Sequence, residues 1–306
     1  MKEPSAPFSG FLDPVDMVMC CPAGTRLAEV NALAGEQQLR FPLVVDPAAT
    51  LAEHLAAVEY ASASARFGPF VDNVLGMNWR VPCGRLVRIG ERVIKSATGY
   101  DLNKFLLHSD GRYGNAVDLV LRLRRRGGEA VRCILRGAHP AIERARISLL
   151  RSPWIHWIDV VDLVVTAGEP AFLYLAADCG RGDVAAFDDY FRQLSAASGT
   201  QLEATEALDY SLPKLSLKTV ITAAPPLAGE LVREHGGQAR VLCASGVVHY
   251  LPPRNLPLLP EPTLRRLELQ CLEQGGHSYG PWSPRRDAVA QESAWATTLE
   301  SAWNHL

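Results

Sequence analysis

The chain has 306 residues, of which 48% are hydrophobic and 21% are charged, and this composition excludes a disordered or fibrous protein. It carries 31 Lys and Arg residues against 33 Asp and Glu. The net charge of −2 gives no overall field that would attract a polyanion, so no nucleic-acid partner is expected. Single hydrophobic cores tend to stop growing at about 250–300 residues, so we expect two domains.

Residues 1–11 are rich in Pro and Ser and are predicted to form an arm. They lack the apolar segment of a signal peptide, and no window of the chain reaches the ~18 apolar residues of a membrane span. The seven cysteines include no CxxC pair and the eight histidines no i, i+4 pair, so neither a disulfide framework nor a metal site is predicted. We expect a cytoplasmic protein without direct membrane insertion.

The predicted elements of residues 12–127 are short. Thr25 is expected to cap the first helix, and Gly127-Gly128 marks the predicted boundary with a second domain at residues 128–306. In chain order we expect a strand at 17–21, a helix at 26–34, a helix after Thr50, a hairpin of 71–81 with 86–89, a short amphipathic helix after 93 and a strand at 115–122.

Beyond residue 128 the hydrophobic pattern alternates between helix and strand periods, which predicts an α+β fold with a layer of helices on one sheet. The expected elements are strands at 130–135, 171–177 and 214–222, a strand pair within 239–251, and helices at 139–151, 184–197, 225–235, 263–274 and 288–304.

Arg122, Arg124, Arg125 and Arg126 form the one dense basic cluster of the sequence. The cluster follows an apolar strand and precedes the Gly pair. We favour a solvated strand end over a phosphate-binding patch, although both interpretations are open.

The stretch from Val93 to Gly114, VIKSATGYDLNKFLLHSDGRYG, ends in two glycines three residues apart. Gly111 and Gly114 follow Ser109 and Asp110, and the apolar run AVDLVLRL comes after them. Such a loop can expose consecutive backbone N–H groups to an anion or a polar ring, or it can be a tight turn that needs two positive φ angles. The residues alone favour neither alternative.

Two further patterns are weak. Gly276-His277-Ser278-Tyr279-Gly280 matches the GxSxG nucleophile elbow, but a helical stretch precedes it where a strand is required, so a serine hydrolase is a distant alternative. His249, in SGVVHYLP, is the one histidine we name as a candidate catalytic base, and a core histidine is the favoured interpretation.

An ordered set of motifs between Leu12 and Arg124 resembles a known family. PAGTRLAEVN and PLVVDPAAT are similar to AGTTLAELN and the LPLDP and AT loops, and RFGPFVDNVLGMNWRVPCGRLVRIG followed by GYDLNKFLLHSDGRYG is similar to RYGSxRDxVLGMxVVLPDGRxxRxGG and AGYDLxxLxxGSEGTLG. These motifs resemble the FAD-linked oxidases with a vanillyl-alcohol-oxidase (PCMH) type flavin-binding domain, most closely the FAD-binding subunit of bacterial glycolate oxidase.

The resemblance implies FAD as the cofactor and a set of residues along it. The SEGTLG loop of the family lies along the flavin, and the corresponding residues here are Ser109, Asp110, Gly111, Gly114 and Asn115. The resemblance also places Pro42, Asp46, Thr50, Arg66 and Gly68 on neighbouring flavin-side elements.

The sequence also departs from the family pattern. The family begins with a subdomain whose PxGGGT loop holds the pyrophosphate, and this chain starts after the place of that loop, so an incomplete flavin-binding domain is expected before the cap or substrate domain. Glu53 replaces a glycine of the ATxGG step. A buried Glu53 facing a diphosphate would be repulsive by an amount on the order of kcal/mol.

The resemblance implies a subunit of a glycolate or other 2-hydroxy-acid oxidase, in which hydride passes from the substrate to the flavin and other oxidase subunits are partners. The alternative is a degenerate, non-catalytic homologue with a structural or partner-binding role. The retained GYDL and SDGRYG motifs favour the first hypothesis, and Glu53 and the absent glycine loop favour the second.

Overall fold

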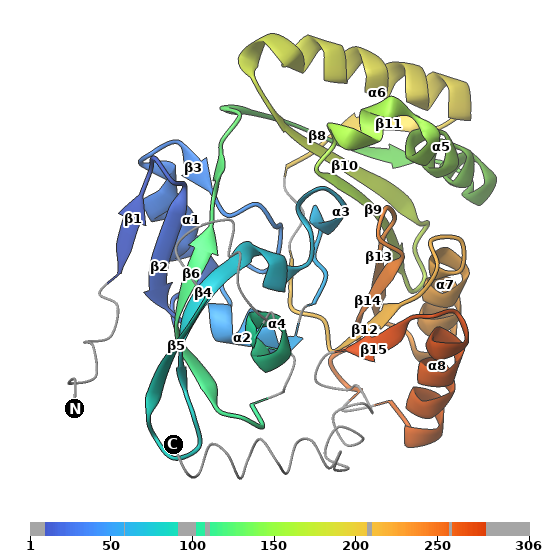
Figure 1. The fold of residues 1–306 in the computed structure, drawn as a ribbon. Helices are drawn as coiled ribbons and strands as arrows, with labels where there is room; N and C mark the ends of the chain where they lie inside the picture. The colour runs from blue at the N-terminus through green and yellow to red at the C-terminus, as the bar shows by residue number, and fades with distance from the viewer. Residues whose placement is uncertain are drawn as a thin grey trace.

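A computed structural model describes residues 10–57, 59–90, 102–107, 111–206, 210–256 and 259–279. Ser109, Asp110 and the predicted helix at 288–304 lie outside these ranges. The described chain forms two antiparallel sheets side by side, with the N-terminal unit on the left of Figure 1 and the C-terminal unit on the right. The predicted mixed fold of helices and sheets is confirmed.

The N-terminal sheet has five strands in the order β1-β2-β6-β4-β5. Helices pack on one face of it, because alternate residues of β2, β4 and β6 share a core with α1, α2 and α4. The bounds are β1 Phe11–Asp13, β2 Val18–Pro22, α1 Leu27–Gly35, α2 Leu51–Ala57, α3 Ser64–Phe67, η1 Phe70–Asn73, β4 Val74–Arg80, β5 Leu86–Gly90, α4 Leu102–Leu107 and β6 Asn115–Arg122.

A two-stranded ribbon and the chain crossing lie beside this sheet. The strand β3 (Leu39–Arg40) pairs with β7 (Arg124–Arg125), and β7 is followed at once by the crossing into the second unit. The N–H of Gly127 donates to Asp178 at 3.0 Å, so this crossing is bonded to the second unit.

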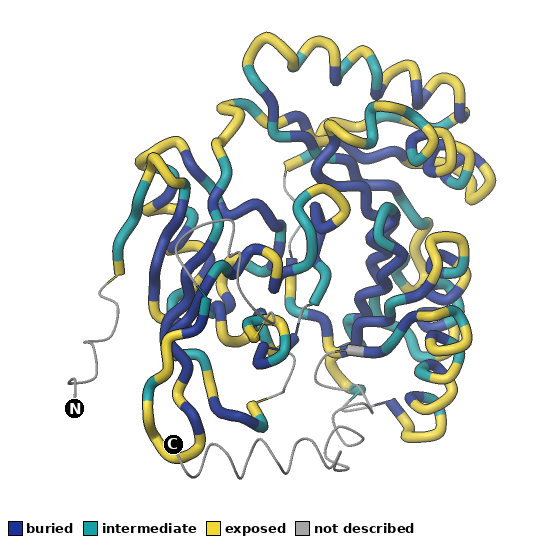
Figure 2. Tube along the Cα trace, in the orientation of Figure 1, coloured by how far each residue is buried: buried dark blue, intermediate teal, exposed yellow. Residues whose placement is uncertain are grey.

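The C-terminal sheet has eight strands in the order β11-β8-β10-β9-β13-β14-β12-β15. The helices α5 to α8 cover one face of this sheet (Figure 1), and Figure 2 shows that the central strands consist mostly of buried residues. The apolar side chains of these helices form a large core with alternate strand residues. The bounds are β8 Glu129–Arg136, α5 His139–Arg151, η2 Pro153–His156, β9 Val160–Thr166, β10 Phe172–Cys179, η3 Arg181–Asp183, α6 Val184–Ser198, β11 Gln201–Ala204, β12 Leu215–Lys218, α7 Ala224–His235, β13 Gln238–Leu242, β14 Val247–Leu251, α8 Glu261–Glu273 and β15 His277–Tyr279.

The other face of the large sheet carries a small apolar cluster of Ile134, Val160 and Tyr174, against which Val44 of the N-terminal unit packs. The helix α3 lies between the two sheets in Figure 1. A segment of the N-terminal unit, residues 59–66, therefore lies on the open face of the C-terminal sheet, and the bonds described below hold it there.

Several details differ from the sequence predictions. Thr25 is not the helix cap, because α1 begins one residue later and its N-cap is Arg26, whose N–H donates to Glu29 at 3.2 Å. The strands β1, β3, β7, β9, β11 and β15 and the helix α3 were not predicted. The strand β9, VVDLVVT, follows a run of tryptophans and is a central strand that pairs with both β10 and β13.

Candidate functional site

The predicted flavin-side residues lie on three separate elements. Pro42, Asp46 and Thr50 belong to the segment between β3 and α2, while Arg66 and Gly68 lie in and directly after α3. Gly111, Gly114 and Asn115 form the turn that leads into β6.

The N-terminal end of α2 does not present Glu53 to a buried site. Glu53 is exposed, and its carboxylate accepts hydrogen bonds from the N–H of Thr50 at 2.7 Å and from the Thr50 hydroxyl at 2.9 Å. The N–H of Glu53 donates in return to the Thr50 hydroxyl at 3.2 Å, which completes a capping box. These bonds lower the pKa of Glu53. The repulsion considered for a buried Glu53 therefore does not apply, since this exposed carboxylate stabilises the helix end.

Asp46 is tied to the same helix. Its carbonyl oxygen accepts a hydrogen bond from His54 Nε2 at 2.9 Å, and its carboxylate accepts from the N–H of Ala48 at 2.9 Å. His54 is fully buried, and burial lowers its pKa. Hydrogen bonds therefore tie Asp46 to the N-terminal part of α2.

The two glycines of the SDGRYG stretch have distinct structural roles. Gly114 has φ +117°, and a Cβ there would lie 1.9 Å from the carbonyl oxygen of Arg80 on β4. Gly111 has φ +79°, and its carbonyl oxygen accepts a hydrogen bond from the N–H of Gly114 at 3.1 Å. A tight turn against β4 accounts for both residues.

Gly68 is a further glycine at a position where a side chain would be strained. It has φ +81°, and a Cβ there would lie 2.9 Å from the Asp72 carboxylate. It ends α3, which carries Arg66 toward the C-terminal unit.

Arg66 takes part in a cluster of ion pairs that joins the two units, which we call the clasp. Its Nη1 lies 2.5 Å from Asp159, a residue whose side chain is only 5% exposed. Asp159 also pairs with Arg40 at 3.2 Å and accepts the N–H of Asp178 at 2.8 Å. Arg40 pairs in addition with the Asp178 carboxylate at 2.6 Å. Arginines of one unit are thus bound to aspartates of the other.

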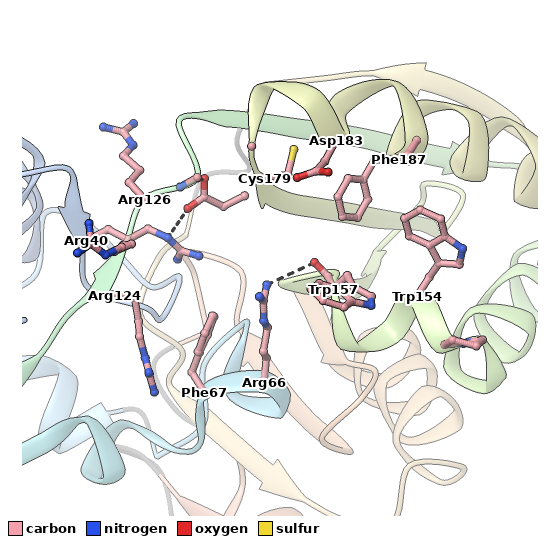
Figure 3. Close-up of a pocket in the computed structure, with 16 residues that line it drawn as sticks. Arg40, Arg66, Phe67, Arg124, Arg126, Trp154, Trp157, Cys179, Asp183 and Phe187 are labelled. Atoms are coloured by element: carbon pink, nitrogen blue, oxygen red, sulfur yellow. Dashed lines mark hydrogen bonds and ion pairs between the residues drawn. The ribbon is translucent and has the colours of Figure 1, made fainter.

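A groove of about 690 Å³ opens beside the clasp, and we call it the arginine groove. In Figure 3, Arg40, Arg66, Phe67 and Arg124 come from the N-terminal side, and Trp154, Trp157 and Phe187 from the C-terminal side. The remaining lining residues are Arg125, Arg126, Gly127, Pro153, Asp178, Cys179, Gly180, Asp183 and Ala186. Its volume falls in the range of ligand sites, roughly 300–1,000 Å³.

A second cavity of about 420 Å³ lies between residues 61–66 and the strands β9 and β13, and Arg66 belongs to the walls of both cavities. Its walls are rich in Ala and Ser, which keep side chains small and leave backbone near the cavity. Ala63 has φ +75°, an uncommon conformation for a residue with a side chain and one that occurs often at functional sites. We call this space the sheet cavity.

Asp162 of β9 is the titratable group of the sheet cavity that the sequence analysis missed. It accepts a hydrogen bond of 2.5 Å from the Ser62 hydroxyl and one of 3.4 Å from Tyr210. Burial raises its pKa to about 6, against the opposing influence of Arg240. A single carboxylate in the apolar run VVDLVVT was the available signal, because an isolated charge in a buried strand needs a partner or a function.

His249, the predicted candidate base, lies on β14 near Arg240, and the cavity at its side chain measures only about 10 Å³. Burial and the Arg240 charge lower its pKa to about 3, and it has a hydrogen bond with the backbone of Tyr60. A histidine with this pKa is a weak base, and this one is enclosed.

The GHSYG pattern does not form a nucleophile elbow. Ser278 lies on the edge strand β15, is 1% exposed, and donates to Glu268 of α8 at 3.2 Å. The neighbouring His277 pairs with Glu59 of the N-terminal unit. The serine hydroxyl is therefore turned to the helix layer.

A flavin dinucleotide combines a flat ring with a charged diphosphate, and the two adjoining cavities offer surfaces for both. The Ala and Ser walls of the sheet cavity leave room for a flat group, and the guanidinium of Arg124 in the arginine groove forms no ion pair among the described residues. The residues present therefore fit such a group in their chemistry. No group of His, Cys, Asp and Glu that could hold a metal ion occurs among the residues described, and no helix within them is long and apolar enough to cross a membrane.

Comparison with known proteins points to flavin-linked oxidoreductases. No protein-family model matches the chain. It is 33% identical over 110 residues to the mitochondrial D-lactate dehydrogenase [cytochrome] of Arabidopsis thaliana, a match that covers 36% of this chain and 19% of that protein. It is 23% identical over 113 residues to an uncharacterized FAD-linked oxidoreductase of Mycobacterium tuberculosis, covering 37% of this chain and 25% of that protein.

Among solved structures, an alkyldihydroxyacetonephosphate synthase matches with a TM-score of 0.62 at 11% identity, over 87% of this chain and 60% of that one. The matched segments thus span only a quarter or less of these two sequence relatives. The chain is therefore similar in sequence to FAD-linked oxidoreductases over about a third of its length, and it has the fold of this synthase over most of its length.

Proposed function

We propose that this chain is an FAD-linked oxidoreductase subunit of a system that oxidises a 2-hydroxy acid such as glycolate or D-lactate. The observation that carries the proposal is the 33% identity to a D-lactate dehydrogenase, since D-lactate is a 2-hydroxy acid. In this proposal residues 12–127 are the flavin-binding part, residues 128–306 are the cap or substrate part, and other oxidase subunits are partners.

The sheet cavity is the place we assign to the reaction. It lies between the two units, and its wall includes Ala63 in a strained conformation and Arg66 with its positive charge. When bound, the flavin would supply the acceptor for the substrate hydride. The backbone of residues 61–65 would support the flat ring, and Arg66 would attract the substrate carboxylate.

The protein itself must accept the hydroxyl proton of the substrate. Asp162 faces the sheet cavity with its pKa raised to about 6, which is close to the value that a general base needs near neutral pH. We assign the role of proton acceptor to Asp162 in preference to His249, whose pKa is lowered to about 3. The Ser62 hydroxyl, 2.5 Å from Asp162, orients the carboxylate.

The test is a flavin titration followed by anaerobic reduction. The purified protein, alone and together with the product of a neighbouring gene, is titrated with FAD and then mixed with glycolate, D-lactate or L-lactate while the flavin absorbance is followed. We expect bound FAD to be bleached by one of the hydroxy acids. Absence of any bound or bindable flavin in both preparations would overturn the proposal.

The variant Asp162→Asn separates binding from chemistry. It keeps the shape of the side chain, so FAD should bind as to the wild type while the rate of flavin reduction falls by roughly 10²–10⁴, the usual contribution of a general base. An unchanged reduction rate in this variant would remove Asp162 from the mechanism without affecting the assignment to the flavin-linked system.

A second candidate function is a non-catalytic, partner-binding subunit of the same system. The supporting observation is that the polar groups of the open sheet face are bonded to residues 59–66 of the N-terminal unit: Ser62 with Asp162, Glu59 with His277, and Tyr60 with His249. FAD that binds but is reduced by none of the acids, together with co-purification of a second flavin-linked subunit, would favour this alternative.

A further inference from the structure

The arginine groove carries more positive charge than the ion pairs of the clasp neutralise. Five guanidinium groups and two carboxylates line it. Arg40 is held by Asp159 and Asp178, and Arg66 is held by Asp159. Arg124 forms no ion pair with any described residue, so its charge is left for a ligand within this part of the chain.

Three of these guanidinium groups lie close to one aromatic ring, that of Phe67. The guanidinium carbons of Arg66, Arg40 and Arg124 lie 5.0, 5.5 and 5.7 Å from the centre of this one ring. Cation–π attraction offsets part of the mutual repulsion. The pKa of Arg124 is nevertheless lowered, by burial first and then by the charges of Arg122 and Arg66. An anion bound at this place would relieve the repulsion.

Arg124 is not simply a solvated strand end, which was the interpretation favoured from the sequence. Its Nε is shielded from solvent and has no hydrogen-bond partner in the described part of the chain. A buried N–H donor without a partner costs roughly 1–3 kcal/mol, and a ligand atom can remove that cost. Arg125 and Arg126 are exposed, and for them the solvated interpretation holds.

The opposite wall of the groove is aromatic. The indole of Trp157 is 62% exposed, although large aromatic side chains are usually covered. Trp154 of the same wall stacks on Tyr190 with the ring centres 4.7 Å apart and makes an edge contact with Phe187 at 5.2 Å. Arg66 reaches across and donates to the carbonyl oxygen of Trp157 at 3.3 Å (Figure 3).

We propose that the arginine groove is a binding site for a small aromatic phosphate ester, with the phosphate between Arg66 and Arg124 and the flat ring against Trp157. Planar guanidinium groups bind phosphate oxygens through two parallel hydrogen bonds, and two such groups match a doubly charged phosphate. An exposed indole provides the face on which an aromatic or nucleobase ring stacks. The groove adjoins the sheet cavity and shares Arg66 with it, and binding of a phosphate ester there can be tested without any flavin.

The test is isothermal titration calorimetry of the full chain, at a fixed ionic strength of about 0.15 M, with phenyl phosphate, AMP and inorganic phosphate as probes. We expect phenyl phosphate and AMP to bind at least tenfold more tightly than inorganic phosphate. AMP is also one half of FAD, so phenyl phosphate, which contains no part of FAD apart from the phosphate, is the probe that distinguishes this site from FAD binding followed by its absorbance.

Four variants locate the site. Arg124→Gln should lower the affinity for both esters at least tenfold. Trp157→Ala should lower the affinity for the esters but not for inorganic phosphate. Arg85→Gln, which replaces an exposed arginine of the β4–β5 turn, is the control and should leave all three affinities unchanged. Arg124→Lys, which keeps the charge and loses the fork, should give an intermediate affinity. Thermal unfolding with and without AMP checks that the variants are folded.

Two results would overturn the proposal. Equal affinities of wild type and folded Arg124→Gln for AMP would show that Arg124 holds no phosphate. Equal affinities for all three probes, reduced as much by Arg85→Gln as by Arg124→Gln, would show general attraction of anions to a basic surface.

Discussion

The clasp should contribute measurably to the stability of the whole chain, and Asp159→Asn tests this. The Asp159 carboxylate is 5% exposed and accepts hydrogen bonds from Arg66, Arg40 and the N–H of Asp178. Asn keeps one oxygen acceptor but loses the charge, and its NH₂ group must face one of these donors.

The expected magnitude follows from the partners. Breaking a buried ion pair by removing one member costs about 3–5 kcal/mol. Arg40 and Arg66 are 18% and 31% exposed, and Arg40 keeps its pair with Asp178, so water and the remaining carboxylate offset part of this cost. We expect Asp159→Asn to lower the free energy of unfolding by about 2–3 kcal/mol, and the melting temperature by about 2 °C per kcal/mol in a chain of this size.

The assay is urea unfolding of wild type and variant, followed by circular dichroism and by tryptophan fluorescence. Asp189→Asn is the matched control, because Asp189 pairs with Arg192 at 2.9 Å but both side chains are about two-thirds exposed, and such pairs are worth about 0–1 kcal/mol. A loss within about 0.5 kcal/mol for Asp159→Asn, equal to that of the control, would refute the role of the clasp.

Further outcomes follow from other positions. Gly114→Ala should lower the free energy of unfolding by more than about 3 kcal/mol in urea unfolding, because its Cβ would lie 1.9 Å from a backbone oxygen. Gly84→Ala, with φ +87° and open space around it, should lower this free energy by about 1 kcal/mol. Equal losses in the two variants would contradict the explanation of Gly114 by a tight turn. Ser278→Ala should leave any hydrolysis of simple esters unchanged, as measured by release of nitrophenol, since its hydroxyl is turned to Glu268; loss of such activity would revive the elbow. The pKa of His249 is lowered from 6.5 to about 3, so its contribution to stability is complete above pH 6.5 and falls by up to about 1.4 kcal/mol per pH unit as the pH drops toward 3. His249→Gln should therefore flatten the dependence of unfolding free energy on pH between about 6.5 and 5, and an unchanged slope would show that the histidine is protonated in the folded state.

Much of the fold could be predicted because its elements carry strong local signals. The helix α5, predicted at 139–151, begins with Pro140 in its first turn and keeps its apolar face, and it has these bounds in the structure. The strand β6 was predicted at its observed bounds from the partial alternation of NAVDLVLR, although four consecutive residues of it are buried. The strand β9 was missed because its run of apolar residues has no alternation, which is typical of a strand buried on both faces.

The site was harder to predict because its chemistry depends on contacts between distant residues. The family pattern has a glycine at the position of Glu53, and the sequence did not reveal that the capping bonds to Thr50 hold this carboxylate at the exposed end of a helix. The sequence did not distinguish Arg124 from its three neighbouring arginines, because its contact with the ring of Phe67 is visible only in the folded structure. The raised pKa of Asp162 comes from its burial, and this burial exists only when the two units are assembled. Ser62 and Arg240, which oppose the shift of this pKa, lie 100 and 78 positions away in the chain.

The pair between Glu59 and His277 joins residues 218 positions apart in the chain. Contacts of such long range form late in folding, because the entropy of closing the intervening loop must be overcome first. The segment 59–66 belongs to the first quarter of the chain, yet the strand β15, which carries His277, is among the last of the described elements to be synthesised. On the ribosome, the segment 59–66 therefore lacks its bond to His277 until β15 has emerged, although all residues that line the two cavities have been synthesised before that.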